Sequence, residues 1–238
     1  MENFVDEFGR RAASRQRLHS VRKFIGGKMA ESLATIPQAS PYFEFQTDAL
    51  LALKNRLKAE NPNVTVTSII ARIMATVLEA YPLMNSAVIG EELVTYESCN
   101  VGIGVGLESG IMMVVVREAQ SKDIFQISDE LKEKTQLLKE GKLPLAEMKG
   151  STFTISSIGV QGIRYSTVII NPPETAMLAI GVTEKRVVVL DDDSTAIRNV
   201  TGFTLTHSHV IMDGFHVGAV IDLMRERVSN PEKYMGLE

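Results

Sequence analysis

A histidine followed four residues later by an Asp-Gly pair is the feature of this 238-residue sequence best suited to chemistry. His209 comes directly after a β-type run at residues 203–206, and Asp213 opens an apolar helical pattern over 215–228. A histidine at a strand end is both held in place and reachable, which a general base requires. A short carboxylate at a helix start accepts backbone N–H groups. The spacing therefore predicts a proton-transfer site that is held by a capped helix.

A structural interpretation of His209 competes with this one. A histidine beside apolar residues is more often a packed or surface residue than a catalyst, and His-x-x-x-Asp-Gly spacing also arises by chance. A short motif is a hypothesis until the surrounding elements support it.

Composition limits the classes of protein that remain. The chain is 45% hydrophobic and has 25 basic against 29 acidic side chains, so it has no basic footprint for a nucleic-acid partner. The single Cys99 excludes an intrachain disulfide and a cysteine-based metal site, and we expect no metal and a reducing, cytoplasmic setting. No apolar run approaches the roughly 20 residues of a membrane span, and the acidic N-terminus does not resemble a signal peptide. We expect an arm at residues 1–17 and one domain at 18–238.

The first part of the chain predicts three helices and a strand. Asp48 is the expected cap of the second helix, and Thr67 or Ser68 that of the third. The third helix is nearly all apolar, which indicates burial against a sheet. The helices cover residues 21–34, 48–59 and 67–80, and the strand covers 42–47.

Two hairpins are predicted next, with turns at residues 90–92 and 108–110. Gly102, Gly104 and Gly106 alternate within a β pattern, so they fall on one face of a strand. No helix follows them directly, which excludes a nucleotide-binding glycine loop. Such a bare backbone face serves either close helix packing or a bound substrate arm.

The last part of the chain predicts two helices and several strands. Helices at both ends with hairpins between them do not form repeated βαβ units. The fold class is therefore α+β, with helices packed on a mixed, mostly antiparallel sheet. The helices cover residues 124–139 and 215–228, and the strands cover 151–156, 176–182, 187–190 and 196–209.

Several short blocks, in order along residues 18–236, resemble the catalytic domain of the dihydrolipoamide acyltransferases. These are the core subunits of 2-oxo-acid dehydrogenase complexes, and the blocks also resemble their relative, chloramphenicol acetyltransferase. His209 and Asp213-Gly214 end the series. The other blocks are SVRK at 20–23, YPLMN at 81–85, NVGI at 100–103, GKL at 141–143, TFTISSIG at 152–159, IINPPE at 169–174 and LAIG at 178–181.

The resemblance implies a chloramphenicol acetyltransferase-like fold and acyl transfer between coenzyme A and a dihydrolipoyl thiol. By matching position, His209 is similar to the family's catalytic base, Asp213 to the aspartate of the same motif, and Ser156 to the serine that stabilises the tetrahedral intermediate. A thiol with a pKa of about 8.5 is mostly protonated at neutral pH, and a histidine with a pKa of about 6.5 can take its proton. The serine hydroxyl then donates to the oxyanion. We expect Asp213 to order the loop.

The sequence departs from the family pattern at several positions. The family's histidine usually follows Asp and precedes Arg, where this chain has Ser208 and Val210, and Val114 replaces a usual proline. The stretch at 213–217 is closer to chloramphenicol acetyltransferase. The acceptor therefore stays open between a dihydrolipoyl thiol and a small hydroxyl compound, and a core-forming scaffold without catalysis is a third interpretation.

The resemblance also implies partners for the domain at 18–238. We expect acyl-coenzyme A as substrate and a lipoyl group on a separate chain, since this sequence has no lipoyl domain and no subunit-binding domain. The family's sites lie between subunits of a trimer, so we expect a homotrimer that can extend to a cubic 24-subunit shell. The acyl group itself cannot be read from the sequence, because pocket residues are scattered over several strands.

Overall fold

A seven-stranded mixed sheet forms the centre of the computed structural model, which describes residues 5–107 and 110–237. The strand order is β1-β9-β8-β7-β5-β6, and β2 also pairs with β9. Pairs β5–β7 and β7–β8 are parallel and the other four are antiparallel, which confirms the predicted sheet type. The strands are β1 (Gln38–Ala39), β2 (Tyr42–Gln46), β5 (Val101–Leu107), β6 (Gly110–Val116), β7 (Phe153–Ser157), β8 (Ala176–Val189) and β9 (Thr195–Ser208).

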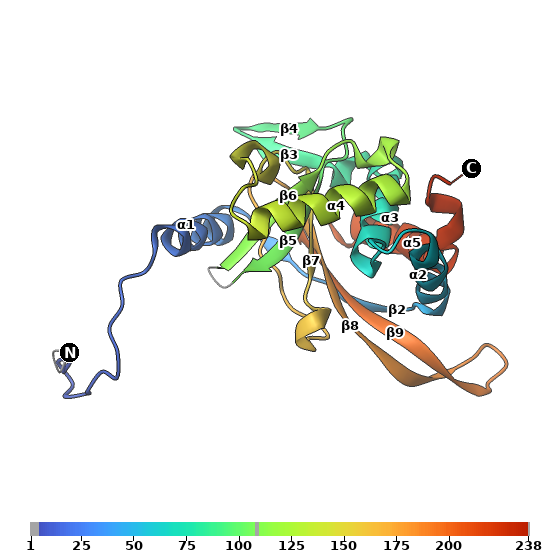
Figure 1. Ribbon diagram of the computed structural model, residues 1–238, viewed down its shortest axis with the longest axis horizontal. Coiled ribbons are helices and arrows are strands. Elements are labelled where there is room, and N and C mark those ends of the chain that lie inside the picture. Colours follow the sequence, from blue (N-terminus) through green and yellow to red (C-terminus); the bar gives the residue numbers. More distant parts are fainter. Residues whose placement is uncertain (1–4, 108–109, 238) are drawn as a thin grey trace.

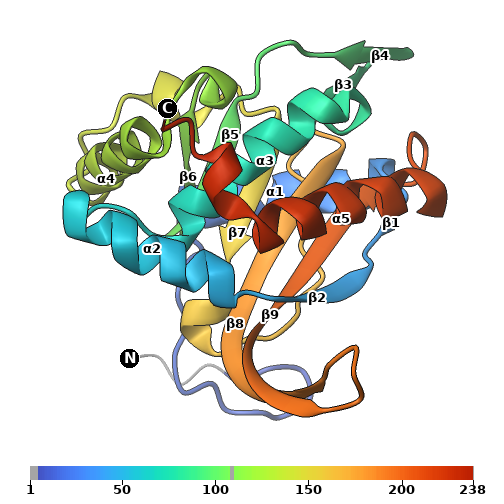
Figure 2. The ribbon, with the colours of Figure 1, turned by 90° about the vertical axis from the view of Figure 1, so that its right-hand side faces the viewer.

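The α-helices from residue 48 onward cover one face of this sheet (Figures 1 and 2). A hairpin of β3 (Ser86–Ile89) and β4 (Glu92–Thr95) forms a separate two-stranded sheet. No described helix is long and apolar enough to cross a membrane. The α-helices are α1 (Ser20–Thr35), α2 (Asp48–Glu60), α3 (Val66–Ala80), α4 (Ile124–Lys139) and α5 (Gly214–Ser229), and the 3₁₀ helices are η1 (Pro82–Met84), η2 (Ala119–Ser121), η3 (Leu145–Met148), η4 (Gly159–Gln161) and η5 (Pro231–Tyr234).

The hydrophobic core lies between the sheet and the helices α2, α3, α4 and α5. Every second residue of the central strands enters it, for example Ile103, Ile155 and Leu205. They meet the apolar face of α3, where Ile69 and Ile73 have no exposed surface. Each such side chain contributes roughly 1.5–3 kcal/mol through burial. The alternation fixes the register, because a slip of one residue would turn the polar set of each strand into the core.

The structure corrects both expected helix caps. The cap of α3 is Thr65, not Thr67 or Ser68: its hydroxyl accepts from the backbone N–H of Ser68 at 3.0 Å. Asp48 is the first residue of α2 and not its cap, and its carboxylate accepts from the side-chain amide of Asn199 at 2.7 Å.

The structure also joins two expected strands. The segments predicted at 176–182 and 187–190 form one continuous strand, β8 (Ala176–Val189), with a register shift between Ile180 and Thr183. The resulting β8–β9 hairpin extends well beyond the helical layer (Figure 2). In the second predicted hairpin, residues 108 and 109 of the turn lie outside the described residues.

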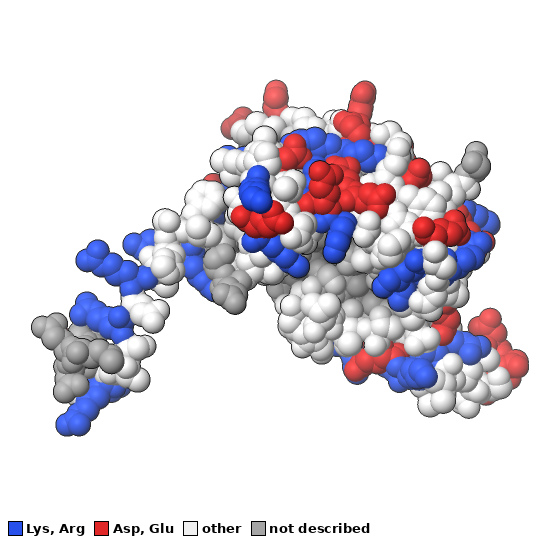
Figure 3. Space-filling model, in the orientation of Figure 1, with Lys and Arg blue, Asp and Glu red and all other residues white. Residues whose placement is uncertain are grey.

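The N-terminal arm stands away from the rest of the molecule, and α1 joins it to the body (Figure 1). Seven basic side chains and no acidic one lie between residues 8 and 30, and lysines and arginines line this projection in Figure 3. Leu18, Phe24 and Leu33 are exposed, Phe24 to 65%. Ser32 fixes the end of α1 through a hydrogen bond from its hydroxyl to the Ile170 carbonyl at 2.6 Å. The region from the arm to the end of α1 is therefore basic and has exposed apolar side chains.

A chain segment crosses the second face of the sheet over two glycines. Cβ atoms added at Gly181 and Gly202 would lie 2.0 Å and 2.6 Å from the Arg164 carbonyl oxygen. The Val182 N–H donates to the Ile163 carbonyl at 2.8 Å, which holds the segment against β8. Only residues without a side chain allow this approach of two backbones.

Gly181→Ala is therefore expected to lower the free energy of unfolding by about 3 kcal/mol or more, because the clash is with backbone that cannot rotate away. Thermal unfolding should show a melting temperature about 6–12 °C lower. Gly218→Ala in α5 is the matched control. A Cβ added at Gly218 would meet no atom within 4 Å, and alanine favours a helix over glycine. Equal melting temperatures for the two variants would contradict the packing described.

Candidate active site

His209 lies just beyond β9, where the strand gives way to the turn before α5. Its backbone N–H donates to the Pro37 carbonyl at 2.8 Å, which holds the turn against the segment before β1. The residue is exposed in the single chain. Its ring centre lies 5.9 Å from that of His207, with the planes inclined by 35°. The structure thus gives His209 the strand-end, accessible position that the sequence predicts.

Asp213 caps α5, as expected from its place before the helix. Its carboxylate accepts from the backbone N–H groups of Phe215 at 3.0 Å and His216 at 3.3 Å. The His216 ring Nδ1 lies 2.8 Å from the same oxygen. The His216 side chain and these N–H groups hold the pKa of Asp213 below its usual value. This carboxylate is engaged with the helix end, and no hydrogen bond joins it to His209 among the described residues.

Ser156 lies near the end of β7, opposite Gly104 of β5. Ser156 is 8% exposed, and its hydroxyl makes no hydrogen bond to the described part of the chain. A Cβ added at Gly104 would lie 3.7 Å from the Ser156 hydroxyl oxygen, and one at Gly106 would meet no atom within 4 Å. Neither glycine faces a helix, so the helix-packing explanation for the alternating glycines is wrong. They leave bare backbone beside Ser156.

The strand register shows how far apart His209 and Ser156 lie in one chain. Ser156 is opposite Ala179, and Ala179 is opposite Thr204. His209 therefore lies five residues further along and two strands across. At about 3.3 Å per residue and 4.8 Å per strand, the two residues are roughly 15–20 Å apart. A single chain does not bring the predicted base and the predicted oxyanion donor together.

Glu174 is a buried carboxylate on the Ser156 side of the sheet that the sequence analysis did not identify as functional. Its Oε1 accepts from Ser151 at 2.5 Å and from both Thr154 and Asn171 at 2.9 Å. Its Oε2 is buried without a partner among the described residues. Thr154 lies two residues before Ser156 on the same face of β7, so this network holds the strand that carries Ser156. The signal available in the sequence was an acidic residue two positions before an apolar strand.

Burial raises the pKa of Glu174, although the Ser151, Asn171 and Thr154 hydrogen bonds and the charge of Lys28 lower it. At pH values well below the ordinary pKa of 4.5, this carboxyl is protonated in both the folded and the unfolded state and does not affect stability. As the pH rises above 4.5 and through the higher folded pKa, the unfolded state ionises more readily, so the free energy of unfolding falls. Glu174→Gln, which cannot ionise, is therefore expected to raise the free energy of unfolding at pH 8.

Thermal unfolding at pH 4, 6 and 8 checks the Glu174→Gln prediction. The stabilisation should be present at pH 8 and should vanish at pH 4, where the carboxyl is protonated in both states. A stabilisation that is the same at all three pH values would mean that the charge of Glu174 plays no part.

Other chemistry finds less support in the described residues. Burial raises the pKa of Cys99 to about 12, so the chain's only thiol stays protonated and does not act as a nucleophile. No group of three or more His, Cys, Asp or Glu side chains suited to a metal ion occurs in residues 5–107 and 110–237.

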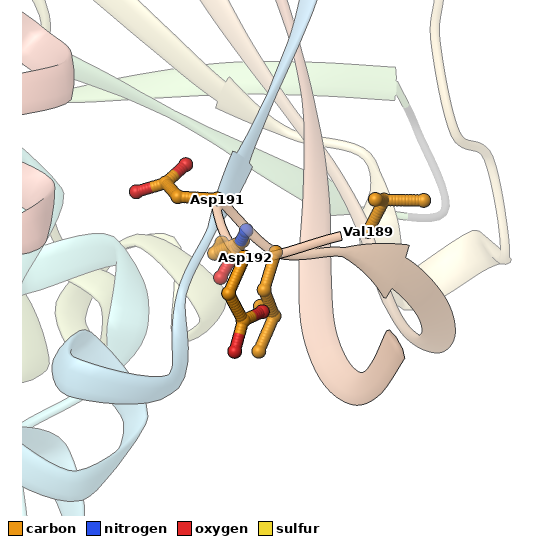
Figure 4. A pocket seen from close by; sticks show the side chains of 5 residues that line it. Val189, Asp191 and Asp192 are labelled. Carbon is orange, nitrogen blue, oxygen red and sulfur yellow. The ribbon is translucent and has the colours of Figure 1, made fainter. Parts of the chain in front are cut away.

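An open pocket lies at the far end of the β8–β9 hairpin (Figure 4). Val189, Asp191 and Asp192 line it, and the two aspartates point away from each other. Val189 is opposite Thr195 at the start of β9, whereas His209 follows the end of that strand. The pocket is therefore remote from the candidate site.

This combination of a mixed sheet, one helical face and a histidine at the end of β9 agrees with a known family. The model of the family "2-oxoacid dehydrogenases acyltransferase (catalytic domain)" matches residues 10–236. The chain belongs to this family. The acetyltransferase component of the pyruvate dehydrogenase complex from Zymomonas mobilis is 30% identical over 219 residues, which cover 90% of this chain and 50% of that protein. The chain spans about half the length of the curated relatives it matches.

Solved structures show the same fold. A probable dihydrolipoamide acetyltransferase from Listeria monocytogenes superposes with a TM-score of 0.87 at 28% identity, covering 91% of this chain and 94% of that one. The cubic core of a pyruvate dehydrogenase multienzyme complex gives 0.89 at 21% identity, covering 94% of both chains. A chloramphenicol acetyltransferase gives 0.54 at 13% identity, covering 85% of this chain and 94% of that one. The predicted chloramphenicol acetyltransferase-like fold is confirmed.

Proposed function

We propose that the protein transfers an acyl group between coenzyme A and a dihydrolipoyl thiol carried on another chain. The observation that carries this proposal is the family match across residues 10–236, which spans both His209 and Ser156. The exposed His209 and the bare glycine face beside Ser156 support it, since the first is reachable and the second leaves room for an extended substrate arm.

In the proposed reaction, one nitrogen of neutral His209 takes the proton of the acceptor thiol while its sulfur attacks the thioester carbonyl carbon. The carbonyl oxygen becomes an oxyanion, to which the Ser156 hydroxyl donates a hydrogen bond. Collapse of the tetrahedral intermediate breaks the bond to the sulfur of coenzyme A. The departing thiolate takes the proton back from the His209 imidazolium, so the base returns to its starting state. Asp213 keeps the turn that carries His209 fixed to α5.

The proposed site is shared between two copies of the chain. Because His209 and Ser156 lie roughly 15–20 Å apart in one copy, a second copy must supply the partner residue if both act on one thioester. The exposed apolar side chains of α1 and the basic arm supply surface for such a contact. We therefore propose a homotrimer as the working unit, with a cubic shell as the larger assembly.

The test is release of free coenzyme A from a panel of acyl-coenzyme A donors. Each donor is offered dihydrolipoamide and, separately, a small hydroxyl compound such as chloramphenicol. We expect release with dihydrolipoamide. If coenzyme A is released only with the hydroxyl compound, the acceptor is a hydroxyl and not a thiol. If an assembled protein releases coenzyme A with neither acceptor, the scaffold interpretation is favoured.

A further inference from the structure

His207 is a buried histidine next to the proposed base, and the described chain leaves its ring without partners. The residue is 3% exposed, and neither Nδ1 nor Nε2 makes a hydrogen bond among the described residues. Buried polar groups in native proteins nearly always have a partner. Leaving one unpaired costs roughly 1–3 kcal/mol, so an apolar residue here would make a more stable protein. The cost suggests that the imidazole is retained for its chemistry.

The distance between the two rings excludes a direct hydrogen bond and fits a bridged one. The ring centres of His207 and His209 are 5.9 Å apart. A direct N–H···N bond brings the centres of two imidazoles to about 5 Å, because its nitrogens must approach within about 3 Å. One water that reaches about 2.8 Å to each ring spans the wider gap.

The surroundings of His207 determine which form of its ring faces that gap. Burial lowers the pKa of His207, and this effect outweighs the nearby Leu205 backbone, which raises it. The charge of His209 lowers the pKa slightly further and the Asp213 carboxylate raises it. The neutral ring has one N–H and one lone pair. A neutral His207 can therefore offer a lone pair to the gap between the two rings.

His209 needs such a partner on its own account. A general base presents a lone pair to the acceptor, so its other ring nitrogen must carry the hydrogen, and a neighbouring acceptor fixes this tautomer. The His209 ring makes no hydrogen bond to the described residues. Asp213, the carboxylate of the same motif, is engaged with the start of α5 and with His216.

We propose that His207 is a positioning residue for His209. One water accepts from the His209 N–H and donates to the lone pair of the His207 ring, and this bridge holds His209 in the tautomer whose free nitrogen faces the acceptor thiol. The kinetic effect of His207 rests on the proposed function, because it requires His209 to act as the base in acyl transfer. The His209 tautomer does not depend on that function, because it is a property of the resting protein.

Two substitutions test the role kinetically. His207→Leu removes both ring nitrogens and keeps a similar volume, and His207→Gln keeps a polar group that can hold the water. We expect His207→Leu to fold at least as stably as the native protein and to lower kcat by about 10- to 100-fold, less than the loss of an ionised orienting carboxylate. KM for both substrates should change by no more than about twofold, because neither substrate touches His207. His207→Gln should recover part of the lost kcat.

Nuclear magnetic resonance of the ¹⁵N-labelled histidine side chains tests the tautomer directly. The chain has four histidines, so substitution assigns each signal. The His209 ring nitrogens should show one dominant tautomer in the native protein and an even mixture in His207→Leu, and this readout does not require turnover.

Three results would overturn the inference: native kcat in a folded His207→Leu protein, loss of activity through KM alone, or His209 nitrogen shifts that do not respond to the substitution. If His207→Leu does not fold, the same comparison is made with His207→Gln, whose native kcat together with unchanged His209 shifts would also overturn it. Lack of acyl transfer by the native protein would refute the proposed function, while the nitrogen shifts would still decide the inference about His207.

Discussion

His209→Ala is expected to lower kcat for acyl transfer by about 10²–10⁴-fold, the usual loss when a general base is removed. The acceptor thiol must lose its proton as it attacks, and at neutral pH only a small fraction of a thiol with a pKa of about 8.5 is ionised without help. The His209 side chain is exposed and makes no hydrogen bond to the described residues, so its removal should leave the fold intact. Its backbone bond to Pro37 is kept in the variant.

The measurement is the initial rate of coenzyme A release with dihydrolipoamide, together with circular dichroism and light scattering. Raising the pH should recover part of the lost rate, because the thiol then ionises without a base. His19→Ala is the matched control: it removes an exposed histidine just before α1 and should retain native kcat. A well-folded His209→Ala protein with full activity would rule out His209 as the base.

The helices and strands were predictable because each faces the core on one side only. The repeated Ile69, Ile73 and Val77 of α3 record a helical face, and the alternation of Phe153 and Ile155 in β7 records a strand face. Periodicity of this kind is a local property, so one sequence is enough to read it. The turn positions follow from glycine and proline for the same reason.

The helix caps show where local information stops. Thr65, Thr67 and Ser68 all have hydroxyls within four residues, and any of them fits the pattern of a capped helix start. The one that caps α3 is fixed by where the backbone turns out of the helix, which depends on how the preceding segment packs.

The candidate site divides along the same line. The sequence locates His209, Asp213 and Ser156 individually, and the structure confirms the strand-end position of the first and the cap position of the second. The sequence could not show the network around Glu174, because Ser151, Thr154 and Asn171 come together only in the folded sheet. Nor could it give the separation of His209 and Ser156, which depends on the order and register of β7, β8 and β9.

Ser156→Ala is expected to lower kcat by about 10²–10³-fold with little change in KM, since an oxyanion donor acts mainly in the transition state. The loss of one buried hydroxyl that has no hydrogen-bond partner in the described chain should not destabilise β7. Ser157→Ala, one residue further along the same strand, is the control and should stay active. If Ser157→Ala is the inactive variant instead, the oxyanion donor is Ser157.

A mixture of the two inactive variants gives the sharper test, because it asks whether one site takes its residues from two copies. His209→Ala subunits still supply Ser156, and Ser156→Ala subunits still supply His209. If the two residues of each site come from neighbouring copies, random reassembly of equal amounts restores both native residues in about one quarter of the sites. Coenzyme A release should then recover to about one quarter of the native rate.

The control for this mixture is the same pair of variants combined without dissociation, which should remain inactive. Reassembly is followed by light scattering, so that a failure to form mixed oligomers is recognised. Mixed oligomers that stay inactive would mean that base and donor act within one chain. That result would require the roughly 15–20 Å between His209 and Ser156 to close by movement of β9 against β7, two strands that are separated by β8 in one continuous hydrogen-bonded sheet. A shared site needs no such movement, and for this reason we expect the mixture to recover activity.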